Sequence, residues 1–438
     1  MPASPSTARV INDRLALRLL QQHGPLTAGQ LKQRTGLSRP TVADLVERLT
    51  DAGLVAVVGE AGEQRRGPNA RLYGIVADRA HLAALDVRTE GVAVVVCDLV
   101  GRVLAEASAP IGGETGTGPA VEQSVALVER VAKEAGAEVL HTVGIGAPGL
   151  IDPATGELRD STGLPEWHRR LVATLQERLP AARIRVENET NLAALAEQRD
   201  GVARDRETFV LLWLGRGTGA AVVLDGRLRR GASGGTGEIG FLPVPGTATL
   251  PSATDCGGGF HSLGGARAVA DLAAAYGLTV RATGGEPHAA ALVRRAADDG
   301  AADGPHHRAA PAREPDPDGT ADRREASAGR GRGGEGPAGH GGHEAGAAGF
   351  LDALADRVAL AAASVVAVLD PGCVVLGGEV GQAGGTVLAE RVERRLRRLS
   401  PLPTEVRPSA LGGTAVLRGA LLTARDRAQD DLFTTGDR

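Results

Sequence analysis

Aromatic residues, cysteines and long apolar runs are all scarce in this chain of 438 residues. With only 2% aromatics, a core has to be built mainly from Ala, Val and Leu. Cys97, Cys256 and Cys373 lie far apart, which excludes a disulfide framework and indicates a reducing compartment. No run of about 18 apolar residues could span a bilayer, and the first residues lack the apolar segment of a signal peptide. We therefore expect a cytoplasmic protein with no membrane partner.

The length and the charge distribution indicate more than one domain. A chain of 438 residues is long enough for two or three. The formal net charge of −4 is uneven, because residues 1–75 carry ten Lys/Arg against six Asp/Glu, which is +4 and leaves −8 for the rest. An anionic partner would therefore bind the N-terminal piece.

Three amphipathic segments in this piece predict three helices. Thr27 to Gln30 has the spacing of a capping box, Gly36 ends the short helix that follows, and Ser38 is a good N-cap for the next. The apolar faces of the first and third helices are predicted to consist of Ile11, Leu15, Leu19 and Leu20, and of Val42, Leu45, Val46 and Leu49.

The second and third segments have the length and the glycine-containing turn of a helix-turn-helix. A β-hairpin is predicted after Gly53, with a basic tip. Residues 1–76 thus predict a winged helix-turn-helix that binds double-stranded DNA, although a bundle of this kind could also be a plain interaction module. The predicted DNA contacts are Ser38, Arg39, Thr41 and Arg48 on the third helix, and Arg65, Arg66 and Arg71 in the hairpin.

A second informative segment runs from Arg183 to Glu197. Its β-leaning beginning delivers Asn188 and Glu189 to the first turn of a helix, where exposed N–H groups favour carboxylates and polar ligands. This arrangement predicts a small-molecule site. The alternative is that both side chains only cap the helix.

Glycine-rich turns surround this segment in a particular order. They comprise 143–152, 215–221, 230–240 and 372–379, and Glu238 lies in the third. With the N-terminal domain, they resemble the ROK family of repressors, open reading frames and sugar kinases over nearly the whole chain. The resemblance implies that Asn188 and Glu238 bind sugar hydroxyls, and it places Glu189 where the kinases have the Asp that acts as general base.

The resemblance also implies the fold. We expect an α/β protein in which the winged helix-turn-helix precedes a two-lobed, actin-like ATPase fold of the ribonuclease H-like type. The first lobe would cover 77–186, the second lobe 187–425, and a C-terminal tail 426–438. Within the second lobe, residues 298–349 are rich in Gly, Ala, Pro and charge, which predicts a disordered insertion. Its histidines could bind metal, but a solvated tract is the favoured interpretation.

Several family features are missing from this chain. The segment 86–91 lacks the two glycines that admit nucleotide phosphates, which favours a simple strand turn. Gly163 and Phe241 replace a sugar-binding Asn and a His. Of the zinc-binding run only Cys256 remains, with His261 near the last ligand position, and two ligands do not complete a zinc site. We therefore predict no enzyme activity, no catalytic residue, no cofactor and no metal.

These observations predict a transcriptional regulator, in the first instance a repressor of sugar-related genes. It would bind a palindromic operator as a homodimer or higher homo-oligomer, and its degenerate kinase domain would sense a sugar or phosphosugar effector and mediate dimerisation. One alternative is an active ATP-dependent sugar kinase with a DNA-binding domain, since Glu189 could still act as a base. Another is a second domain that serves only as a dimerisation platform.

Overall fold

The computed structural model describes residues 5–61, 70–159, 164–280, 285–302 and 340–434. By its internal contacts the chain forms two units. The first comprises Met1–Arg199, Arg230–Thr236 and Thr414–Arg438, and the second comprises Asp200–Arg229 and Gly237–Gly413. The chain therefore passes between the units more than once.

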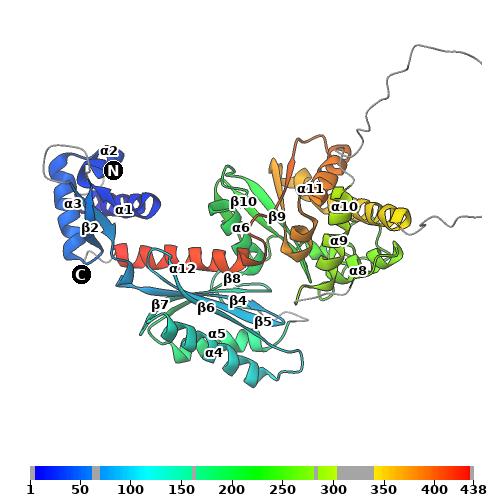
Figure 1. Cartoon of the computed structure of the whole chain (residues 1–438), viewed down its shortest axis with the longest axis horizontal. Coiled ribbons are helices and arrows are strands. Elements are labelled where there is room, and N and C mark those ends of the chain that lie inside the picture. Colours follow the sequence, from blue (N-terminus) through cyan, green and yellow to red (C-terminus); the bar gives the residue numbers. More distant parts are fainter. Residues whose placement is uncertain (1–4, 62–69, 160–163, 281–284, 303–339, 435–438) are drawn as a thin grey trace, which may run out of the picture. The chain divides into compact units, whose positions relative to one another are not determined.

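The N-terminal part of the first unit is a winged helix (Figure 1). Its elements are α1 (Pro5–His23), β1 (Leu26–Thr27), α2 (Ala28–Thr35), α3 (Arg39–Asp51), β2 (Val55–Ala61) and β3 (Ala70–Ile75), and the strands pair in the order β1-β3-β2. The capping box predicted at Thr27 is present, and Gly36 ends α2 in the left-handed conformation with φ of 71°. This order of elements confirms the predicted fold of the N-terminal domain.

The apolar face predicted for the first helix is partly wrong. Ala16, Leu17 and Leu20 are buried, whereas Ile11 and Leu15 are 55% and 38% exposed. Both stripes have helical spacing, so periodicity alone could not decide which one packs against α2 and α3.

The remainder of the first unit is a five-stranded sheet covered by helices. After the short helix η1 (Ala77–Arg79) the elements are β4 (His81–Arg88), β5 (Gly91–Asp98), β6 (Val103–Pro110), α4 (Thr117–Glu134), β7 (Leu140–Ala147), α5 (Trp167–Arg178), β8 (Arg183–Asn188), α6 (Glu189–Arg199) and α12 (Ala415–Thr434). The strand order is β6-β5-β4-β7-β8, antiparallel from β6 to β4 and parallel from β4 to β8. Helices α4 and α5 cover one face, and α12 crosses the other (Figure 1).

The second unit contains a sheet of the same topology. Its elements are β9 (Phe209–Leu214), β10 (Thr218–Leu224), β11 (Arg227–Arg229), η2 (Ile239–Phe241), α7 (His261–Gly264), α8 (Ala266–Ala275), α9 (His288–Ala302), α10 (His340–Leu369), β12 (Cys373–Gly377), α11 (Gly378–Leu399), β13 (Glu405–Pro408) and η4 (Gly412–Thr414). Its strand order is β11-β10-β9-β12-β13. As in the first sheet, the strands pair antiparallel from β11 to β9 and parallel from β9 to β13. Two such sheets confirm the predicted ribonuclease H-like, actin-like fold.

Small aliphatic side chains build the core, as the composition predicts. The largest cluster of the second unit consists mainly of Ala, Val and Leu, with Phe260 and Phe350 as its aromatic members. In the first unit, α12 approaches β7 and α6 closely. A Cβ at Gly419 would lie 2.0 Å from the carbonyl oxygen of Leu192, and a Cβ at Gly144 would lie 2.5 Å from that of Ala420. Glycine at these two positions is therefore required by the close approach of the backbones.

Three predicted boundaries differ from the elements observed. Helix α9 runs to Ala302 and α10 begins at His340, so both ends of the 298–349 segment are helical, and 303–339 lies outside the described residues. Helix α12 continues to Thr434, across the predicted boundary at 425, and it packs in the first unit. The sequence alone could not show that the last helix packs in the first unit, because this placement depends on the contacts of α12 with α6, β4 and β7.

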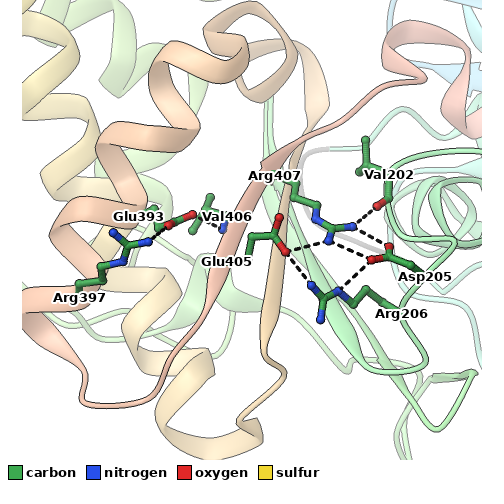
Figure 2. A network of polar contacts seen from close by, with 8 residues as sticks. All are labelled: Val202, Asp205, Arg206, Glu393, Arg397, Glu405, Val406 and Arg407. Carbon is green, nitrogen blue, oxygen red and sulfur yellow. Dashed lines mark hydrogen bonds and ion pairs between the residues drawn. The ribbon is translucent and has the colours of Figure 1, made fainter.

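A network of charges ties the edge strand β13 to the segment before β9 (Figure 2). Arg407 donates to both carboxylate oxygens of Asp205, at 2.7 and 3.1 Å, and to Glu405 at 2.7 Å. Arg206 reaches the same Glu405 oxygen at 2.7 Å. The Arg407 hydrogen bonds lower the pKa of Asp205 to about 2, so this network needs ionised carboxylates.

Candidate nucleic-acid interface and ligand site

The N-terminus of α3 is fixed by its cap. Ser38 Oγ accepts a hydrogen bond from the Thr41 amide at 3.3 Å and lies 2.7 Å from Thr41 Oγ1. Pro40 in the first turn has the backbone φ that a helix start requires. The side chain of Arg39 is exposed and Thr41 is partly exposed, while the opposite face of α3 is buried. The leading edge of α3 thus presents a cation and a hydroxyl to solvent, as a recognition helix does.

Arg48, the fourth residue predicted on this surface, is partly exposed and is paired with carboxylates of its own domain. It lies 2.6 Å from Asp13 of α1 and also pairs with Asp44 on its own helix. These two partners favour a structural role in which Arg48 joins α3 to α1. Its contact with DNA stays a prediction that would require one of the pairs to open.

The hairpin β2–β3 forms the wing. Arg71, near the beginning of β3, is exposed. Arg65 and Arg66 fall in the segment 62–69, which lies outside the described residues. Of the three basic residues predicted at the wing, the structure therefore places Arg71 alone.

The pair Asn188–Glu189 lies where β8 ends and α6 begins, as predicted. Asn188 Oδ1 accepts hydrogen bonds from the amides of Thr190 and Asn191, at 2.9 and 3.3 Å. Its Nδ2 donates to the carbonyl of Gly149 at 3.1 Å and to Glu189 Oε2 at 2.9 Å. Asn188 therefore does cap α6, and the same side chain orients Glu189 and the turn after β7. Their role as effector ligands stays a prediction.

Glu187 and Arg230 form an ion pair that sequence reasoning missed. Glu187 is buried, and its Oε1 accepts from Asn191 Nδ2 at 2.8 Å, while its Oε2 accepts from Arg230 Nε at 2.7 Å. Strand alternation places Arg183, Arg185 and Glu187 on one face of β8, and this was the available signal. No local pattern pointed to Arg230, which lies 43 residues further along the chain.

The segment 86–91, which lacks the glycines of a phosphate loop, is a tight turn. Strand β4 ends at Arg88 and β5 begins at Gly91, and both nitrogens of the Arg88 fork lie within 2.8 Å of Asp86 Oδ2. Asp86 is buried; burial raises its pKa and Arg88 opposes that rise. The prediction of a simple strand turn is confirmed, and the Asp86 carboxylate next to this turn is paired with Arg88.

Glu238 belongs to the second unit, where it immediately precedes η2. The residue as a whole is exposed, whereas burial of its carboxyl group raises the pKa of that group. Of the two aromatic residues near this turn, Phe260 is fully buried and Phe241 is 38% exposed. Phe260 packs in the core of the second unit, whereas η2 turns Phe241 outward. Gly163 of the first unit lies outside the described residues.

Cys256 and His261 were the remnants of a zinc-binding run. Cys256 is partly exposed, and burial lowers the pKa of His261. Within the described ranges, no three His, Cys, Asp or Glu side chains gather as a metal site would require. None of the helices described there has the length and apolar character needed to cross a membrane.

The fold and the site together define a class of protein, in which a winged helix is joined to two ribonuclease H-like lobes of the sugar-kinase type. Comparison with known families agrees. The ROK family model matches residues 82–268 and 333–427, which is more than half of the chain, and a MarR family model matches residues 12–67. The chain belongs to the ROK family.

Curated relatives include repressors. The N-acetylglucosamine repressor of Escherichia coli O157:H7 is 28% identical over 242 residues, which cover 53% of this chain and 57% of that protein. The xylose repressor of Bacillus subtilis (strain 168) is 22% identical over 247 residues, which cover 55% of this chain and 62% of the relative. The chain thus spans less than two thirds of the length of these relatives.

Solved structures include both a regulator and kinases. A ROK family transcriptional regulator, described as a homologue of the E. coli MLC protein, superposes with a TM-score of 0.69 at 20% identity and covers 97% of this chain and 98% of that one. The ROK hexokinase from Thermus thermophilus gives 0.56 at 26% identity, covering 80% of this chain and 99% of the enzyme. The likeness to the regulator is one of fold, and it extends over the winged helix.

Proposed function

We propose that this protein is a DNA-binding transcriptional repressor of sugar-related genes, and that its ROK lobes sense an effector without transferring phosphate. The observation that carries the proposal is the exposed leading edge of α3, where a capped helix start presents Arg39 and Thr41. The curated relatives that are named repressors support the same function. In this proposal two copies of the chain bind a palindromic operator.

The degenerate turn between β4 and β5 supports the loss of kinase activity. A nucleotide phosphate needs a loop with free N–H groups and little side-chain bulk. Here the strands are joined by a short turn, and Arg88 is paired with Asp86. In addition, Glu189 carries one methylene more than the Asp of the kinases, which moves the carboxylate by about 1 Å and can lower a rate by on the order of 100-fold.

The proposed effector ligands for a sugar or phosphosugar are Asn188 and Glu189 in the first unit and, taken by itself, Glu238 in the second unit. Asn188 and Glu189 are already oriented by hydrogen bonds, which would reduce the entropy lost on binding. A thermal-shift screen of sugars tests this role, since a ligand that binds only the folded protein raises its melting temperature. We expect Glu189→Ala to abolish that rise.

The DNA test uses the full chain and duplex DNA from its own promoter region at low salt. We expect Arg39→Ala to weaken binding by about 1–3 kcal/mol if Arg39 contacts a base edge. Arg130→Ala, which removes the same charge from the exposed surface of α4, is the matched control and should leave affinity unchanged. Failure of the wild-type protein to bind this DNA would contradict the proposal.

A coupled assay of ATP consumption across a sugar panel tests the enzymatic alternative. We expect no turnover above background with any sugar. Turnover that Glu189→Ala abolished would show an active kinase and would overturn the second half of the proposal.

A further inference from the structure

A cavity of about 280 Å³ lies within the first unit, between the edge strand β8 and helix α12. Gly144 and Ile145 of β7 contribute to its wall, and Leu192 of α6 closes one side. Its charged lining consists of Asp152, Arg185, Glu187, Arg230 and Arg427. The cavity is therefore small, and arginine is its commonest charged residue.

The two carboxylates in this lining are already neutralised. Glu187 pairs with Arg230 at 2.7 Å, and Asp152 pairs with Arg159 at 2.7 Å. The pKa of Asp152 is lowered, chiefly by its hydrogen bond from Arg159, so this carboxylate stays ionised and engaged. Neither acid is left to balance the other arginines of the cavity.

Arg185 and Arg427 supply an excess of positive charge. Arg427 lies 3.3 Å from Asp431, but that carboxylate also pairs with Arg183. No carboxylate among the described residues forms an ion pair with Arg185, which is exposed at the edge of the sheet. Arg427 thus shares its carboxylate with Arg183, and Arg185 adds a positive charge at the edge of β8.

We propose that this cavity binds the phosphate group of a small phosphorylated metabolite, and that Arg185 and Arg427 hold it. Guanidinium groups form paired, charge-assisted hydrogen bonds with phosphate oxygens. A cavity of 280 Å³ is below the usual range for drug-sized ligands, which favours a compact phosphate monoester over a nucleotide. Neither Asn188 nor Glu189 is among the residues that line this cavity.

Helix α12 connects this cavity to the winged helix. Two residues beyond Arg427, the buried Gln429 donates to the carbonyl of Leu99 at 3.0 Å and to Gln21 Oε1 of α1 at 2.9 Å. Gln21 in turn donates to the carbonyl of Val100 at 3.0 Å. A phosphate held by Arg427 restrains α12 next to the hydrogen bonds of Gln429. The bound ligand therefore alters the affinity of the winged helix for DNA. This coupling rests on the proposed function.

Calorimetry of the full chain in phosphate-free buffer tests the site. We expect inorganic phosphate and glucose 6-phosphate to bind competitively, and glucose, the neutral counterpart, not to compete. Arg185→Gln and Arg427→Gln should each weaken binding about tenfold or more, whereas Arg130→Gln on α4 should not change it. Arg185 is exposed, so its substitution should leave the circular dichroism spectrum unchanged.

Three outcomes would overturn the site: no heat with either anion, equal binding of glucose and glucose 6-phosphate at this cavity, or unchanged affinity in Arg185→Gln. The DNA arm separates the two proposals. Operator affinity that does not respond to saturating glucose 6-phosphate refutes the coupling through α12. Failure of the ligand-free protein to bind any promoter DNA refutes the proposed function and leaves the calorimetric result standing.

Discussion

Replacing Gly419 with alanine should destabilise the first unit, although alanine is the better helix former. In an open helix interior, Gly→Ala gains up to about 1 kcal/mol in propensity. At Gly419 the new Cβ would lie 2.0 Å from the carbonyl oxygen of Leu192 and 2.5 Å from its carbon. Real Cβ atoms essentially never come within 3.0 Å of such atoms, so α12 and α6 have to separate.

The magnitude follows from this separation. The two helices must move apart by about 1 Å, and a gap of that size forfeits a quarter to a half of each contact's attraction. Overpacking of a tight core costs about 1–3 kcal/mol. Because both colliding groups are backbone, we take the upper end, and after the propensity gain the expected net loss is about 2 kcal/mol.

Urea unfolding followed by circular dichroism measures the loss, and hydrogen exchange locates it. Amides of α6 and α12 should exchange faster in Gly419→Ala, while those of the second unit should not change. The matched control is Gly118→Ala in α4, where a Cβ has no neighbour within 4 Å, and its stability should stay equal or rise. A Gly419→Ala protein as stable as the wild type would refute the close packing of α12 on α6.

Three further predictions concern charge and thiols. Acid should loosen the edge strand β13 as the pH falls from about 4 towards 2. In the folded protein the pKa of Asp205 is lowered from 3.8 to about 2, and the stabilisation from its ionised carboxylate is lost when it is protonated. Hydrogen exchange measured as a function of pH should show this loosening, and Arg407→Met should remove it. A thiol reagent should label Cys256 in the folded protein. Cys373 should be labelled only on unfolding, because its thiol is buried and its pKa is raised to about 11. Rapid labelling of Cys373 in the folded protein, detected by mass spectrometry, would contradict its burial. Arg48→Ala should lower the melting temperature of the winged helix by disrupting pairs worth on the order of 1 kcal/mol, with no change in base preference in a DNA selection experiment.

Local sequence patterns were sufficient to predict several structural elements. The capping box at Thr27 and the N-cap at Ser38 are both present, since each depends on atoms no more than three residues away. The missing glycines of segment 86–91 likewise predicted a plain turn, because the space that a phosphate needs is set by the backbone of those few residues. The buried stripe of α3 follows from its period in the same way.

Tertiary structure decided what depends on residues distant in sequence. Arg48 is in the expected helix, but only its contact with Asp13, 35 residues away, shows that its charge is engaged within the domain. The pairing of Glu187 with Arg230 spans 43 residues and left no local pattern. The choice between the two apolar stripes of α1 also required the packed domain, since both have the same period.

The sequence by itself therefore determined the types of the elements, their caps and the family to which the chain belongs. Only the folded structure decided that the last helix returns to the first unit, lies against α6 and carries a contact to α1. The physical reason is the distance along the sequence over which each interaction acts. Helix caps and hydrophobic periodicity depend on residues a few positions apart, whereas close backbone packing and ion pairs depend on which distant segments the fold brings together.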